Sequence, residues 1–96
     1  MTEAALQRKC IVYCWENDIM AYKMDASTRG FPDLLLIFEN GHVAFVELKN
    51  PNGSGRLSAM QISTIQKLTD RHVDVQVIDS FDAFTDLVRE RINADA

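Results

Sequence analysis

The feature that most constrains this chain is a pair of apolar segments separated by Asn40-Gly41. The segment from Asp33 to Glu39 reads DLLLIFE, which is too apolar for a solvated surface and too short for a helix, so it predicts a central strand. The segment from Val43 to Lys49 predicts a second strand, and Asn-Gly between two such runs is typical of a β-hairpin. A hairpin therefore lies at the heart of the predicted fold.

The segments before the hairpin predict one helix and one short strand. Thr2 is a helix N-cap residue, and the helix that it begins runs to about Asn17 with an apolar stripe made of Leu6, Cys10 and Cys14. Tyr22 and Met24 then alternate with polar neighbours, as in a strand.

The segments after the hairpin predict a helix, a strand and a second helix. Ser58 and Gln61 form a capping-box signature for a helix that ends near Arg71. A fourth strand is indicated by the alternating valines Val73, Val75 and Val77. A last amphipathic helix follows the cap residue Ser80, and its apolar residues are Phe84, Leu87, Val88 and Ile92. The predicted order is α-β-β-β-α-β-α, in a single α/β domain over residues 1–96.

Composition restricts the class of protein. With 47% hydrophobic and 25% charged residues the chain is typical of a globular protein, and it has neither a membrane-spanning apolar run nor a signal peptide, so we expect a cytoplasmic location. Cys10 and Cys14 lie one helical turn apart and are expected to be buried, reduced thiols. The net charge of −4 argues against a nucleic-acid partner, unless the acidic residues cluster away from basic ones.

Two short patterns carry the candidate chemistry. Asp33 heads the first strand of the hairpin, and Glu47 and Lys49 lie on one face of the second, with Leu48 on the other face. Two carboxylates and one cation are the set needed to hold Mg²⁺ near a phosphodiester, and the backbone carbonyl of Leu48 is a further candidate ligand.

Whether Asp33 shares the face of Glu47 depends on the hairpin loop. A two-residue turn at Asn40-Gly41 would place Asp33 opposite Leu48, on the wrong face for a shared metal. A three-residue loop, with Gly41 left-handed, would place Asp33 opposite Glu47. The metal-site hypothesis requires the three-residue loop.

An ordered set of motifs resembles a known family. Gly30-Phe-Pro-Asp33, Glu47-Leu-Lys49-Asn-Pro51, and Gly55-Arg-Leu-Ser58 followed by Gln61 are similar to the virus-type replication-repair nuclease domain (VRR-NUC), a branch of the PD-(D/E)XK nuclease superfamily. The resemblance runs from about Arg29 to Ser80. It implies a restriction-endonuclease-like core, a mixed four-stranded sheet flanked by helices.

The resemblance also implies an activity and roles for residues. Asp33 and Glu47 would bind Mg²⁺ or Mn²⁺, Lys49 would position or activate the attacking water, Gln61 would assist, and Glu3 would be an auxiliary carboxylate. Stand-alone members imply a phage or bacterial setting and a homodimer acting on branched DNA such as Holliday junctions. Neither an organic cofactor nor a membrane partner is implied.

Each candidate residue has a simpler interpretation. Asp33 is suited to the start of a strand, Glu3 is favourable at a helix N-terminus, and the capping box accounts for Gln61 without catalysis, since one amide is not expected to satisfy both roles fully. Glu47 and Lys49 would be a solvated pair were their strand face not apolar. The remaining polar residues are assigned by type: phosphate contacts for Arg29, Arg56 and Lys23, and a solvated turn residue for His42.

Three functional interpretations stay open. The first is an active structure-specific endonuclease, the second a nuclease fold that only binds nucleic acid or a protein, and the third an unrelated α/β interaction module. The third predicts no divalent-metal binding and is compatible with a two-residue hairpin turn. The preferred DNA structure is outside what the motifs determine.

Overall fold

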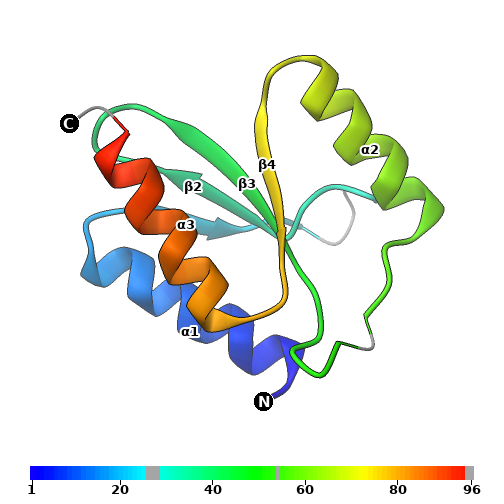
Figure 1. Cartoon of the computed structure of the whole chain (residues 1–96), viewed down its shortest axis with the longest axis horizontal. Coiled ribbons are helices and arrows are strands. Elements are labelled where there is room, and N and C mark those ends of the chain that lie inside the picture. The colour runs from blue at the N-terminus through cyan, green and yellow to red at the C-terminus, as the bar shows by residue number, and fades with distance from the viewer. Residues whose placement is uncertain (26–28, 54, 95–96) are drawn as a thin grey trace.

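The computed structural model describes residues 1–25, 29–53 and 55–94. Its elements follow the predicted order and are α1 (Glu3–Glu16), β1 (Met20–Lys23), β2 (Leu34–Ile37), β3 (Val43–Leu48), α2 (Ala59–Asp70), β4 (Asp74–Ile78) and α3 (Phe81–Asn93), as Figure 1 shows. Ser54, in the predicted loop between Asn50 and Gly55, lies outside the described residues. Within the described ranges, no helix is long and apolar enough to cross a membrane.

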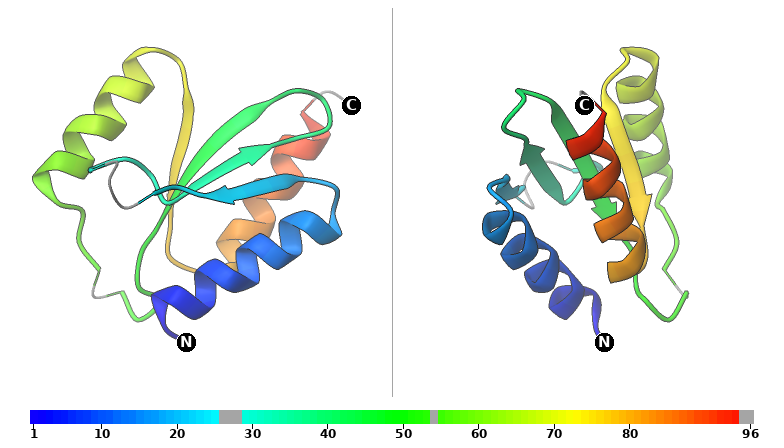
Figure 2. Two further views of the ribbon diagram at one scale, coloured as in Figure 1. Left: turned by 180° about the vertical axis from the view of Figure 1, so that it is seen from behind. Right: turned by 60° about the vertical axis from the view of Figure 1, so that its left-hand side comes forward.

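The four strands form one mixed sheet in the order β1-β2-β3-β4. The first three strands are antiparallel neighbours, and β4 runs parallel to β3 after the crossover through α2. Helices α1 and α3 pack against each other, whereas α2 packs against β4 and stands apart from the other two helices, as the left-hand view in Figure 2 shows. The mixed four-stranded sheet flanked by helices is confirmed.

The hydrophobic core lies between the sheet and the pair α1 and α3. Alternation along β3 sends Ala44, Val46 and Leu48 to this face, where all three are fully buried. Cys10 and Cys14 are free and buried, as predicted from the α1 stripe. The remaining core residues come from α1, β1, β2, α3 and the connections between them: Leu6, Ile19, Ala21, Leu34, Leu36, Phe38, Phe84, Leu87 and Val88. Glu47 alternates along β3 with Val46 and Leu48 and therefore lies on the opposite face of the sheet, beside α2.

The hairpin has the three-residue loop that the metal-site hypothesis requires. Leu34 pairs with Val46 and Ile37 pairs with Val43, and the amide of Phe38 donates to the carbonyl of His42 at 2.9 Å. Gly41 has a φ of 87°, a left-handed conformation that is unfavourable for residues with a side chain. The same register places Asp33 opposite Glu47, so the alternative of a two-residue turn is wrong.

His42 is a partly solvated residue of the hairpin loop with a partner that the sequence analysis did not predict. Its side chain is 39% exposed, and its Nε2 lies 2.7 Å from Oδ2 of Asp74 at the start of β4. Arg91 of α3 also donates to Asp74, from Nε at 2.6 Å and from Nη2 at 3.2 Å. The carboxylate thus joins the hairpin, β4 and α3, which is a contact among three segments far apart in the sequence.

Candidate active site

Asp33 lies immediately before β2, where the strand ladder ends. Its backbone carbonyl accepts from the amide of Met24 at 2.7 Å, which holds the main chain beside β1. Its side-chain Oδ2 accepts from the amide of Leu48 at 2.9 Å, in the place where a strand partner would otherwise bond. These two bonds fix the carboxylate at the open end of the hairpin, where β2 begins and β3 ends, opposite Glu47.

Glu47 is a buried carboxylate in which one oxygen accepts hydrogen bonds and the other has no partner among the described residues. Its side chain is 1% exposed. Oε2 accepts from Nζ of Lys49 at 3.2 Å and from Nε2 of Gln61 at 3.0 Å. Oε1 has no hydrogen-bond partner among the described residues, although it is buried. A buried carboxylate oxygen without a partner is costly in an isolated protein, which indicates a position that a ligand would satisfy.

Gln61 serves the helix cap and the site together. Its backbone amide donates to Oγ of Ser58 at 3.1 Å, and its side-chain Oε1 accepts from the amide of Ser58 at 2.9 Å, which completes the capping box. The same Oε1 accepts from Nζ of Lys49 at 3.3 Å, while Nε2 donates to Glu47. The expectation that one amide could not satisfy both roles is therefore wrong, because a carbonyl oxygen accepts two hydrogen bonds and the NH₂ group remains for the carboxylate.

Burial and charge act against ionisation of Glu47. Burial, followed by the nearby charge of Asp33, raises the pKa of Glu47 to about 7, and the hydrogen bond and charge of Lys49 act in the opposite direction. Two carboxylates share the site with one lysine, so the ionised cluster is one positive charge short. A bound cation would supply that charge.

The donor set fits a hard divalent cation. Asp33 and Glu47 offer carboxylate oxygens, and the unpartnered Oε1 of Glu47 is the clearest ligand position. Because the N–H and C=O of a strand residue point toward the same neighbouring strand, the Leu48 carbonyl faces the side of Asp33. In the part of the chain that the structure describes, no group of three Asp, Glu, His or Cys side chains is arranged to hold a metal, so further ligands would come from the backbone, water or substrate.

The other predicted site residues lie at the surface of the protein. Glu3 is exposed in the first turn of α1, and it does not join Asp33 and Glu47 in a three-carboxylate group. The three predicted phosphate contacts are all exposed; they are Arg29 and Arg56 in the loops that precede β2 and α2, and Lys23 at the end of edge strand β1. Their placement at the surface is compatible with contact to a large polyanion.

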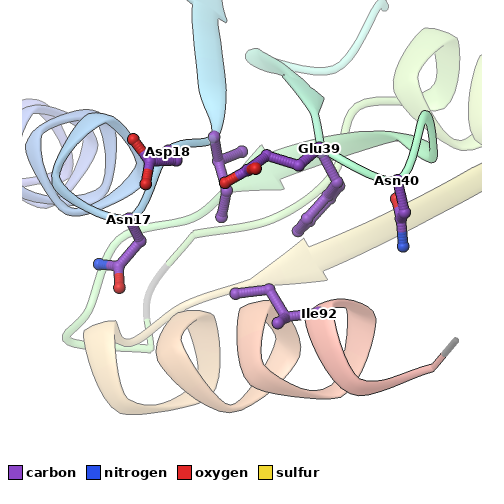
Figure 3. Close-up of a pocket in the computed structure, with 7 residues that line it drawn as sticks. Asn17, Asp18, Glu39, Asn40 and Ile92 are labelled. Atoms are coloured by element: carbon purple, nitrogen blue, oxygen red, sulfur yellow. The ribbon is translucent and has the colours of Figure 1, made fainter. Parts of the chain in front are cut away.

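A separate hollow of about 230 Å³ lies at the opposite end of the hairpin. Figure 3 shows its polar side chains coming from the turn after α1 and from the hairpin loop, with Ile92 of α3 alongside; those labelled are Asn17, Asp18, Glu39 and Asn40. Glu39 follows β2, whereas Asp33 precedes it, so the hollow and the carboxylate cluster lie at opposite ends of that strand. The hollow does not take part in the candidate chemistry.

Comparisons with known proteins identify the family and support the fold. The family model of the VRR-NUC domain matches residues 3–82, a wider span than the motifs alone suggested. A solved structure described as "VRR_NUC domain" is similar at 25% sequence identity with a TM-score of 0.79, covering 91% of this chain and 94% of the solved chain. No match was found among curated proteins.

Proposed function

We propose that this chain, which belongs to the VRR-NUC domain family, hydrolyses phosphodiester bonds of DNA with Mg²⁺ or Mn²⁺ held by Asp33 and Glu47. One observation carries the proposal: a buried carboxylate with an unpartnered oxygen lies opposite a second carboxylate and beside a lysine. A fold that had lost its chemistry would have no reason to retain this costly arrangement.

The residues divide the chemical work among them. Asp33, Glu47 and the Leu48 carbonyl would hold the cation, which when bound lowers the pKa of water and neutralises charge on the phosphate. The ammonium of Lys49 has three N–H donors, and two of them meet oxygens of Glu47 and Gln61 among the described residues. The third is available to orient a water or a phosphate oxygen, and the lysine side chain is 15% exposed, enough to reach substrate.

The distribution of charge supports approach of DNA from the side of α2. Residues 48–69 contain no Asp or Glu, and they include Lys49, Arg56 and Lys67. Acidic residues are more frequent on α3 and the segment before it, which contain Asp79, Asp82, Asp86 and Glu90. The net negative charge of the chain is therefore compatible with DNA binding, because the charged residues of the 48–69 stretch are all basic.

We further propose that the substrate is branched DNA and that the acting species is a homodimer, in the cytoplasm of a bacterial or phage-infected cell. One domain supplies one cleavage site, and paired cuts at a branch need two. The alternative is a nuclease fold that binds nucleic acid or a protein without cleaving.

A cleavage assay on a panel of DNA structures tests the proposal. Labelled four-way junction, flap and plain duplex are incubated with the purified protein, with and without Mg²⁺ or Mn²⁺, alongside Lys49→Ala and Asp33→Ala. We expect metal-dependent cleavage, strongest on the junction and lost in both variants. Junction binding without cleavage under either metal would support the alternative, and sedimentation of the protein would report whether it is a dimer.

A further inference from the structure

Gly30 makes an unusually close approach to α2. A Cβ atom built at this position would lie 2.6 Å from Cγ of Met60, 3.0 Å from the backbone carbonyl oxygen of Met60 and 3.0 Å from Oγ1 of Thr64. The φ angle of Gly30 is 75°, which also disfavours a side chain. Because one of the three contacts is with backbone, rotation of the Met60 side chain would not make room. The loop before Asp33 can dock on α2 only where it has no side chain.

The close contact matters because α2 is weakly attached elsewhere. No residue of α2 is fully buried, and the helix packs chiefly against the edge strand β4. At its first turn α2 is connected to the end of β3 by hydrogen bonds, which run from Gln61 to Glu47 and Lys49. Packing at Gly30 and hydrogen bonding at Gln61 therefore act on the same end of the helix.

We propose that Gly30 is a positioning residue, which sets the distance of α2 from β3 so that Gln61 reaches both Glu47 and Lys49. This role rests on the proposed nuclease function, since Gln61 acts there by holding the two charged groups. The three atoms nearest to an added Cβ at Gly30 belong to Met60 and Thr64, so Gly30 would act on the carboxylates through α2.

The expected effect of a side chain at Gly30 follows from the distances. Rotation of the half-exposed Met60 side chain can relieve the 2.6 Å contact, but the 3.0 Å contact with the Met60 carbonyl oxygen can open only if the loop or the first turns of α2 move by a few tenths of an ångström. The Gln61 bonds to Glu47 and Lys49 are 3.0 and 3.3 Å long, so a shift of that size would break at least the longer one. Lys49 would then lose one of the two oxygens that hold it.

The test compares Gly30→Ala with Gly53→Ala. Gly53 is the matched control because its φ is 78° and nothing lies within 4 Å of an added Cβ, so it reports the conformational cost alone. Amide hydrogen exchange measures the protection of α2, α1 and α3 in both variants, without metal or DNA. We expect faster exchange confined to α2 in Gly30→Ala, and kcat lowered roughly tenfold or more at a KM changed less than about twofold.

A double-mutant cycle with Gln61→Ala separates positioning from general damage. If Gly30 acts through Gln61, the double variant cleaves no more slowly than the slower single variant. Full additivity of the two losses, or α2 protection and kcat equal to those of Gly53→Ala, would overturn the proposal. If the natural chain cleaves no DNA, the proposed function fails, and the exchange comparison alone then decides: faster exchange in α2 supports the positioning role, and unchanged exchange refutes it.

Discussion

The substitution Glu47→Gln should stabilise the metal-free protein above neutral pH. Burial and the charge of Asp33 raise the pKa of Glu47 from 4.5 to about 7. The folded state thus binds the proton of the Glu47 carboxyl group more tightly than the unfolded chain does. The stability contributed by the protonated carboxyl group is fully present below about pH 4.5 and is lost as the pH rises through 7.

The size of the effect follows from the pKa difference. Each pKa unit corresponds to about 1.4 kcal/mol, so the shift of Glu47 amounts to roughly 3 kcal/mol at high pH and to about 2 kcal/mol or slightly more between pH 5 and pH 8. An amide at this position does not titrate. The free energy of unfolding of Glu47→Gln, relative to that of the natural chain, should therefore increase by about 2 kcal/mol from pH 5 to pH 8.

Urea unfolding of both proteins at the two pH values, in chelator, measures this difference directly. Titrating groups that do not interact with Glu47 are common to both proteins, so their contributions cancel, whereas Asp33 and Lys49 interact with Glu47 and belong to the measured difference. Mg²⁺ added at pH 8 should stabilise the natural chain, because a ligand that binds only the folded state raises its stability, and it should have little effect on Glu47→Gln. Parallel pH dependences of the two proteins would refute the reasoning about burial, and equal stabilisation by Mg²⁺ would refute the metal assignment.

Three further substitutions test the scaffold around the site. Asp74→Asn should lower the free energy of unfolding by about 1–3 kcal/mol, because Arg91 and His42 lose their anionic partner, and an unchanged urea midpoint would contradict this. Burial opposes ionisation of Asp74, but hydrogen bonds from Arg91 and His42 hold its pKa well below the usual range, so the variant should also lose less stability as the pH falls toward 3 than the natural chain does. Gly41→Val should cost about 1–3 kcal/mol in thermal or urea unfolding because its φ is 87°; a neutral effect would mean that the hairpin loop tolerates another conformation. Ser58→Ala removes the acceptor at the N-cap of α2 and should cost about 1 kcal/mol, with faster amide exchange in the first turn of the helix as the check.

Local patterns made most of the fold predictable. Alternation, cap residues and the Asn-Gly turn each depend on neighbours in sequence, so the seven elements and the ends of α2 follow from them. The sequence leaves two hairpin registers open, of which the metal-site hypothesis requires the one in which Asp33 faces Glu47, and the observed loop meets that requirement.

Contacts between distant segments were not predictable in the same way. Asp74 reads as an ordinary residue of a strand end, yet it binds His42 and Arg91, which lie 32 and 17 positions away. Gly30 was recognised only as part of a motif, because the reason for its size is the proximity of α2, which no local pattern reveals. The shared use of the Gln61 amide was also missed, although the capping box and the position of Gln61 on the inward stripe were both visible in the sequence.

The candidate site residues differ in how well their positions could be predicted from the sequence. Asp33, Glu47 and Lys49 are fixed by strand pairing and come together as the motifs predicted. Glu3 and the arginines lie on the surface of elements whose distance from the cluster depends on packing, and the structure leaves them exposed. Their roles remain predictions for the DNA-bound state.

Cleavage by Asp33→Asn is the most direct test of the central claim. The substitution keeps an oxygen able to accept from the Leu48 amide but removes the charge that a divalent cation needs. With folding verified by circular dichroism, the natural chain should cleave a labelled four-way junction only when Mg²⁺ or Mn²⁺ is present, and Asp33→Asn should lose at least about 100-fold in rate. Cleavage by the variant at the natural rate, or cleavage by the natural chain in chelator, would contradict a metal-dependent site at Asp33 and Glu47.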